Sequence, residues 1–211
     1  MKRLFAIVVV ALLAGIIFPC EALCANYKNA KITRIGVSSV SAPTFNSSKH
    51  PATTASNWCL IDVEYSLDGE RGNWIDDLEI RWFVAIKTDN GNKILTLFRN
   101  VKYCDIEANK KHVASVMIGP RLFERYTSYK RADAAKVSAY VEVYVGGKLV
   151  VRKERKSNSI SVDNWWTNME KPSKRMENAL LPRYMTPFYF VDSHYYDAEV
   201  QEPASKSGTG K

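Results

Sequence analysis

The run LEIRWFVAIK at residues 78–87 alternates apolar and polar side chains along most of its length. One face would carry Leu78, Ile80, Trp82, Val84 and Ile86. The other face would carry charged residues, which include Glu79, Arg81 and Lys87. Because successive side chains of a β-strand point to opposite sides, this pattern predicts a strand with one face in a hydrophobic core.

Similar patterns lie on both sides of this run. Residues 58–67 (WCLIDVEYSL) would turn Cys59, Ile61, Val63 and Tyr65 toward the core. After residue 87 the sequence Asn90-Gly91 favours a hairpin turn, because both residues tolerate a positive φ angle. The chain would then return over residues 93–106, as one strand or as two.

Four further strands and one helix complete the pattern. The strands are expected at residues 30–40, with an irregularity, and at 112–118, 137–145 and 148–156. Gly146-Gly147 would form the turn between the last two. A short helix is expected at residues 120–129, because Pro120 suits a first helical position. Residues 41–57 are rich in Ser, Thr, Asn and Pro and predict an exposed loop.

Many short strands with frequent turns predict a mostly β protein, an antiparallel β-sandwich with one short helix. The length fits one domain, which we place at residues 26–198. The end of the chain, residues 199–211, contains EPASKSGTGK and is expected to be a disordered tail.

The N-terminus has the order of a secretory signal peptide. Lys2 and Arg3 precede an uncharged apolar run at residues 4–18, and small residues follow at plausible cleavage points. The run is shorter than the roughly 20 residues of a membrane span, so we expect residues 1–25 to be cleaved, with no retained transmembrane helix. The protein would then be exported to the periplasm, the outer membrane or the cell surface.

If the signal peptide is cleaved after Cys24, the mature chain keeps two cysteines, Cys59 and Cys104. An even pair in an oxidising compartment predicts a disulfide, whereas two buried free thiols are the alternative. The two residues do not form a C-x-x-C motif, which argues against a redox or zinc site.

The formal net charge of +8 favours anionic partners such as acidic glycans, or it serves solubility alone. The export signal and the absence of nucleic-acid-binding motifs argue against nucleic acid as a partner.

Asp192-Ser193-His194 contains the residue types of a catalytic triad, but the side chains of neighbouring residues on an extended chain point apart and cannot converge on one site. Asp76 and Asp77 fit a turn better than a metal or glycosidase site. We therefore expect no enzyme, no metal and no cofactor.

The aromatic residues near the C-terminus are the main candidates for binding. Residues 180–196 contain two Pro, which disfavour a central strand, so we expect extended chain wrapped over the sandwich with a short edge strand at residues 188–192. Exposed aromatic rings favour protein contacts and sugar stacking, and buried ones would seal the core. The candidates for partner or glycan contact are Trp165, Trp166, Tyr184, Phe188, Tyr189, Phe190, Tyr195 and Tyr196.

The signal peptide, the strands WCLIDVEY, LEIRWFVAIK and AYVEVYVGGK, and the closing LLPRYMTPFYF resemble a family of exported pilus-like proteins. These proteins are encoded beside type IV pilus assembly genes in mucin-degrading gut bacteria. The resemblance covers about residues 30–195. It implies an immunoglobulin-like sandwich, an association with the envelope or outer membrane, and no catalytic site. The chain differs from a pilin in lacking the Gly and Glu that flank a prepilin cleavage site.

Together these observations predict a non-enzymatic envelope protein that is pilus-associated or adhesin-like. Its partners would be envelope or pilus assembly proteins, or further copies of itself. The alternative is a carbohydrate-binding module that uses the exposed aromatic residues.

Overall fold

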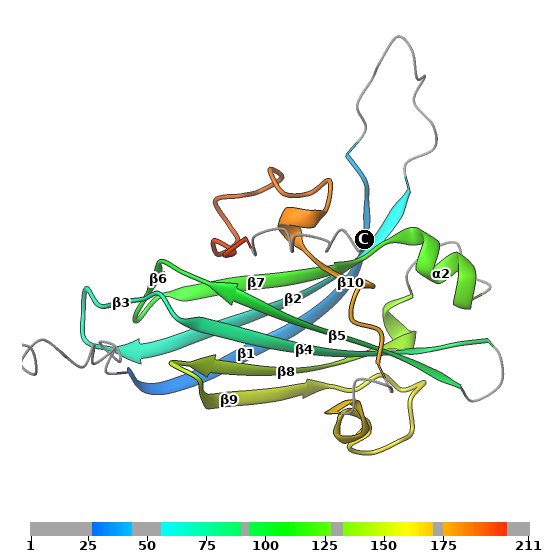
Figure 1. Cartoon of the computed structure of the whole chain (residues 1–211), viewed down its shortest axis with the longest axis horizontal. Helices are drawn as coiled ribbons and strands as arrows, with labels where there is room; N and C mark the ends of the chain where they lie inside the picture. Colours follow the sequence, from blue (N-terminus) through cyan, green and yellow to red (C-terminus); the bar gives the residue numbers. More distant parts are fainter. Residues whose placement is uncertain (1–26, 44–55, 90–92, 128–132, 171–174, 202–211) are drawn as a thin grey trace, which may run out of the picture.

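Two antiparallel four-stranded sheets pack face to face in the computed structural model (Figure 1). The structure describes residues 27–43, 56–89, 93–127, 133–170 and 175–201. The architecture confirms the expected mostly β, immunoglobulin-like sandwich. The first sheet has the order β1-β2-β7-β10, and the second has the order β5-β4-β8-β9.

The first sheet consists of β1 (Tyr27–Ser41), β2 (Asn57–Gly69), β7 (Lys111–Ile118) and β10 (Leu180–Pro182). The pairing of β1 with β2 shifts its register between Ile32 and Arg34, which is the irregularity expected in the first strand. The second sheet consists of β5 (Ile94–Tyr103), β4 (Leu78–Lys87), β8 (Val137–Val145) and β9 (Lys148–Arg155).

The core lies between the two sheets and follows the alternation in the sequence. Every apolar residue assigned to the inner face of β4 is fully buried, as are Cys59, Ile61 and Val63 of β2. Trp82 and Tyr65 are the largest of these buried side chains. Full burial of one such side chain contributes about 1.5–3 kcal/mol, so this interior stabilises the fold.

Three smaller elements differ from the sequence expectations. The expected helix is shorter, because α2 (Pro120–Tyr126) ends where the Thr127 N–H and hydroxyl both donate to the Phe123 carbonyl. Just before Asp76 and Asp77, which were expected in a turn, the chain forms β3 (Trp74–Ile75), which pairs with β6 (Ile106–Glu107). The expected edge strand at residues 188–192 is wrong, because these residues form turns; the edge strand is β10 instead.

The two open sides of the sandwich are closed in different ways. On one side β1 lies beside β9, where the Lys153 ammonium donates to the carbonyls of Ile32 (3.2 Å) and Thr33 (2.6 Å). On the other side, residues 197–200 bridge the sheets, because the Asp197 N–H donates to the Val113 carbonyl of β7 and the Val200 N–H donates to the Lys102 carbonyl of β5.

Several expectations concern residues outside the described ranges. They are the signal peptide at 1–25, most of the loop at 41–57, the Asn90-Gly91 turn and the last ten residues of the tail. Within the described ranges, no helix has the length and apolar character needed to span a membrane.

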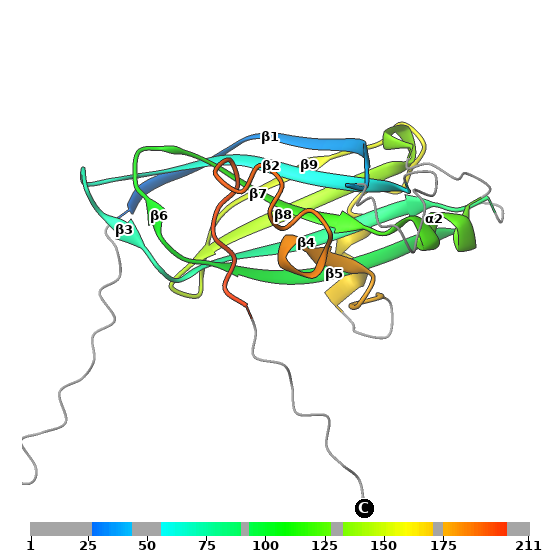
Figure 2. The same cartoon turned by 90° about the horizontal axis from the view of Figure 1, so that it is seen from above.

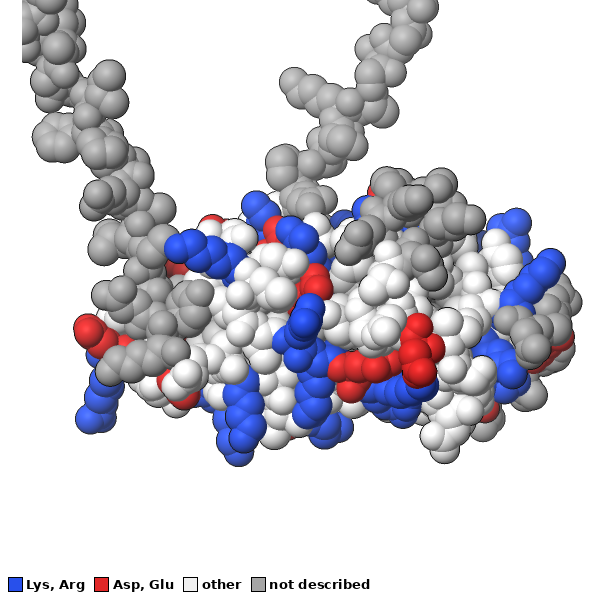
Figure 3. Space-filling view, turned by 90° about the horizontal axis from the view of Figure 1, so that it is seen from below, with Lys and Arg blue, Asp and Glu red and all other residues white. Residues whose placement is uncertain are grey.

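Charge is mixed on the lower face of the molecule. Figure 3 shows basic side chains spread along this face, with an acidic group among them. On the outer side of the second sheet, Glu79 accepts from Arg81 at 2.6 Å, and the Arg81 guanidinium lies 4.0 Å from the centre of the Tyr144 ring. Neighbouring opposite charges balance one another, so this face offers no uniform attraction for an anion.

Candidate functional site

Residues 180–201, called here the C-terminal segment, form an irregular cap on the first sheet. The segment begins with β10, which pairs with β7, and continues through η4 (Arg183–Met185) into consecutive turns. Figures 1 and 2 show it in orange to red on the upper side of the sandwich. Pro182 lies at the end of the edge strand, where a missing N–H costs no ladder hydrogen bond.

Arg183 holds the turns of this segment together from inside. Its side chain is buried, and one nitrogen, Nη2, donates to the carbonyls of Phe188 (2.7 Å) and Val191. The guanidinium carbon lies 3.8 Å from the centre of the Tyr196 ring. Burial lowers the pKa of Arg183, while Tyr196 and nearby carboxylates favour the charged form. A buried guanidinium thus replaces the ladder hydrogen bonds that a strand at residues 188–192 would have made.

Glu199 provides a second anchor. Its carboxylate accepts the backbone N–H groups of Arg183 (3.0 Å) and Tyr184 (2.9 Å). Burial raises the pKa of Glu199, although these two hydrogen bonds oppose the effect. The carboxylate therefore satisfies backbone donors at the start of η4 that would otherwise lie unpaired.

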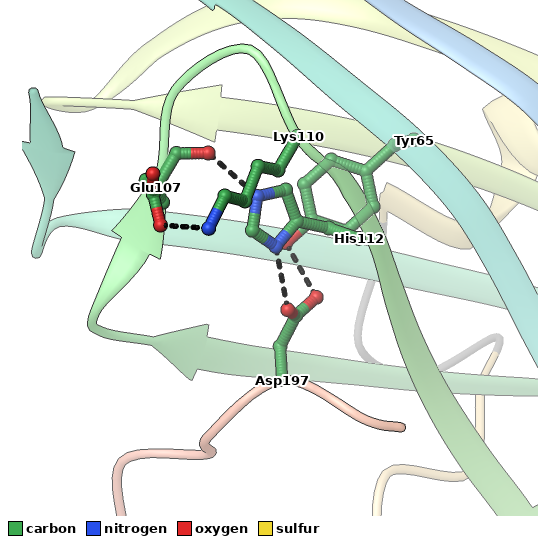
Figure 4. A network of polar contacts seen from close by, with 5 residues as sticks. All are labelled: Tyr65, Glu107, Lys110, His112 and Asp197. Carbon is green, nitrogen blue, oxygen red and sulfur yellow. Dashed lines mark hydrogen bonds and ion pairs between the residues drawn. The ribbon is translucent and has the colours of Figure 1, made fainter. Parts of the chain in front are cut away.

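Asp197 provides a third anchor, shown in Figure 4. One oxygen lies 2.7 Å from Nδ1 of His112, and the other accepts the Tyr65 hydroxyl at 2.9 Å. Nε2 of His112 lies 2.7 Å from the Glu107 carbonyl, so both ring nitrogens face acceptors. Burial opposes the charge on His112, but the hydrogen bonds to Asp197 and Glu107 outweigh it and raise the pKa. The arrangement favours an imidazolium that ties β7 to the C-terminal segment.

The aromatic candidates in this segment divide into buried and exposed residues. Phe188 is buried, with its ring 5.8 Å from that of Trp58 in an edge-on contact, and Tyr184 and Tyr196 are half-buried. Phe190 is 84% exposed, and Tyr189 and Tyr195 are also exposed. We define the C-terminal apolar patch as the exposed residues Met185, Tyr189, Phe190, Val191 and Tyr195. The structure therefore removes Phe188 from the surface candidates.

A pocket of about 340 Å³ opens beside part of this patch. Its lining consists of Arg183, Tyr189, Phe190, Ser193, Tyr196, Asp197, Ala198 and Glu199. The three anchor residues form polar parts of the lining, and aromatic rings supply most of the rest. The pocket is thus bounded partly by anchors that the fold holds in place and partly by exposed rings.

Trp165 and Trp166 lie elsewhere, on the outer face of the second sheet. Trp165 opens η2 (Trp165–Glu170), is buried, and donates its indole N–H to Glu154 at 3.0 Å. The Trp166 ring is half-buried and stacks on Tyr140 with ring centres 4.3 Å apart. Trp165 belongs to a second apolar cluster with Phe83, Ala85, Phe98, Tyr140, Ile160 and Met169. Of the two alternatives for Trp165, the structure shows the buried one, because η2 folds back onto the sheet.

The expected Cys59–Cys104 disulfide is also absent, since both thiols are free. Cys59 is buried near the start of β2, whereas Cys104 follows β5. Figure 1 shows the start of β2 and the β5–β6 connection at opposite ends of the sandwich. A disulfide requires Cα atoms within about 7 Å, so these positions do not suit one.

Asp192, Ser193 and His194 are exposed in the turns of the C-terminal segment. Among the described residues, no group of three His, Cys, Asp or Glu side chains is placed to hold a metal ion. Nothing in the sequence indicated that Arg183, Asp197 and Glu199 are anchors. The residues around a charged side chain in the sequence do not show whether it will be buried or exposed to solvent.

Comparison with known proteins found a matching family model and a solved structure with the same fold. A protein-family model matches residues 22–203, which is most of the chain. A crystal structure of a protein from Akkermansia muciniphila has the same fold, with a TM-score of 0.69 and 18% sequence identity. The superposition covers 84% of this chain and 96% of that one. A comparison with curated proteins gave no match.

Proposed function

Because the chain belongs to this family, which is defined by likeness to a pilus-associated protein, we propose that it is a non-enzymatic component of a bacterial surface structure. In this proposal the protein is exported and works by contact with envelope or pilus assembly proteins, or with copies of itself. The C-terminal apolar patch is the contact surface.

The main support for this proposal is the exposure of the C-terminal apolar patch. Five apolar residues within eleven positions of the chain lie at the surface, and Phe190 is the most exposed of them. Scattered exposed apolar residues are ordinary, but several of them with aromatic rings on one short segment mark an interaction surface. The anchors Arg183, Asp197 and Glu199 hold the segment in place, so little conformational entropy is lost when a partner binds.

The first experiment is fractionation of native host cells with an antibody against the protein, separating periplasm, outer membrane and sheared surface fibres. Recovery with fibres or outer membrane is the expected result. Recovery only as free periplasmic protein would contradict the proposal.

A matched pair of variants then tests the surface itself. Met185→Ser/Tyr195→Ser removes two patch residues, and Leu149→Ser/Val162→Ser removes two residues of similar exposure outside the C-terminal segment. We expect only the first variant to leave the fibre or membrane fraction while keeping its thermal stability. Equal retention of both variants would argue against the patch as the contact surface.

A further inference from the structure

The pocket in the C-terminal segment combines an apolar wall with polar groups. Tyr189 and Phe190 form an edge-on pair with ring centres 4.8 Å apart, and Phe190 is largely uncovered. Tyr196 lies on the lining with its ring against Arg183. Ring faces of this kind pack against the C–H groups of a ligand while its polar edge stays hydrated.

The polar groups of the pocket are held before any ligand arrives. Asp197 is fixed by His112 and Tyr65, and Glu199 is fixed by two backbone N–H groups. Carboxylate oxygens accept more than one hydrogen bond, so both residues retain acceptor capacity. Ser193 adds a hydroxyl that can donate or accept. Pre-formed polar groups lower the entropic cost of binding a small ligand.

The charges around the pocket nearly cancel. His112 pairs with Asp197, and the carboxylates of Glu199 and Asp192 lie close enough to favour the charge on Arg183. A free anion would meet two fixed carboxylates, and a free cation would meet the buried guanidinium. The balance disfavours ions of either sign and leaves an uncharged ligand with many hydroxyl groups as the best match.

We propose that this pocket binds one neutral saccharide ring, which packs a C–H face on Phe190 and Tyr189 and directs hydroxyl groups toward Asp197, Glu199 and Ser193. The volume of about 340 Å³ lies at the lower end of the range for small-ligand sites, which suits a single ring. The site specifies the carbohydrate-binding alternative, because of the aromatic candidates for glycan contact it uses Tyr189, Phe190 and Tyr196, and not Trp165 or Trp166. It shares Tyr189 and Phe190 with the proposed contact surface, but sugar binding does not require the partner contact.

The test is saturation-transfer difference NMR on the purified protein, with galactose and N-acetylglucosamine as neutral probes and with sialic acid and glucosamine as charged ones. The neutral sugars are expected to receive saturation, with dissociation constants in the millimolar range. The charged sugars are expected to bind more weakly. Absence of transfer to both neutral sugars, or a preference for a charged one, would overturn the proposal.

Variants then locate the site. Phe190→Ala and Ser193→Ala change exposed side chains, so the fold is expected to survive, which a thermal melt checks. Phe190→Ala should weaken neutral sugar binding about tenfold, and Ser193→Ala should weaken it to a lesser degree. The control Met185→Ala changes a patch residue outside the pocket lining and should leave affinity within about twofold. Unchanged binding in Phe190→Ala would refute the assignment, whereas loss of fibre association in the Met185 and Tyr195 variants concerns only the partner contact.

Discussion

Nδ1 of His112 lies 2.7 Å from Oδ1 of Asp197, across 85 positions of the sequence. This contact joins β7 to the C-terminal segment and is shielded from solvent, since the two side chains are only 9% and 11% exposed. The Tyr65 hydroxyl completes the arrangement from β2. The attachment of the C-terminal segment therefore depends in part on the proton that His112 carries.

Stability should fall as the pH rises through the raised pKa of His112. The pKa of His112 is raised in the folded protein, so its contribution is complete below the ordinary value of 6.5 and is lost as the pH rises through the folded value. The loss should not exceed about 1.5–3 kcal/mol, the usual contribution of a hydrogen bond to a charged group. Chemical denaturation between pH 6 and pH 9 measures the difference in free energy of unfolding between wild type and His112→Gln. A difference between the two proteins that does not shrink with rising pH would contradict the assignment.

Arg183→Met should loosen the C-terminal segment. The substitution preserves much of the side-chain volume but removes the guanidinium donor from the carbonyls of Phe188 and Val191, of which the Phe188 carbonyl still accepts the Val191 N–H. A buried acceptor that loses its donor costs about 1–3 kcal/mol. Limited proteolysis should cut the variant within residues 184–196 sooner than wild type, and Arg125→Met, which changes an exposed arginine of α2, should behave like wild type.

The two cysteines should differ in reactivity. Burial raises the pKa of the Cys59 thiol to about 12, and burial together with Asp105 raises that of Cys104. Because the thiolate is the reactive form, Cys59 should resist iodoacetamide at pH 8 until the protein unfolds, while Cys104 should react slowly in the native state. Peptide mass spectrometry before and after addition of urea reads out both sites. A requirement for prior reduction would show a disulfide and contradict the free thiols.

Gly36→Ala should disturb the outer face of the first sheet. A Cβ atom at this position would overlap Oδ1 of Asp62, whose other oxygen accepts from Arg34 at 2.9 Å. Relief of this overlap requires the carboxylate to move, which we expect to cost about 1–3 kcal/mol. The cause is checked by urea denaturation of wild type, Gly36→Ala, Asp62→Ala and the double variant. Gly36→Ala should cost much less stability when Asp62 is already Ala, because the carboxylate is then absent. If the two substitutions lower the free energy of unfolding additively, the overlap with Asp62 is not the cause.

The two neighbouring tryptophans should contribute unequally. Trp165→Ala removes a buried ring and should cost about 3–5 kcal/mol, whereas Trp166→Ala removes a half-buried ring from its stack on Tyr140 and should cost less. Thermal unfolding followed by circular dichroism compares them. Equal costs would mean that Trp166 is packed as deeply as Trp165. Neither variant is expected to alter sugar binding, since both rings lie outside the pocket.

The inner faces of the strands could be predicted because burial in a sheet follows a local rule. The alternation over residues 58–67 and 78–87 identified the core side of β2 and β4, and no long-range information was needed. The same rule could not place Trp165, because an aromatic pair after a strand has no periodicity that distinguishes a covering turn from an exposed one. Nor could it exclude the Cys59–Cys104 pair, since spacing along the chain says little about distance across a sandwich.

By itself the sequence determined that this protein is an antiparallel sandwich with its aromatic residues concentrated toward the C-terminus, because strand alternation and turn chemistry act between residues close in the chain. Only the tertiary structure decided which aromatic rings remain at the surface and which charges hold them. Tyr65 and Asp197 meet across 132 positions of sequence. Contacts of that kind depend on the path of the whole chain, and a buried anchor such as Arg183 is chemically identical, in the sequence, to a solvated one.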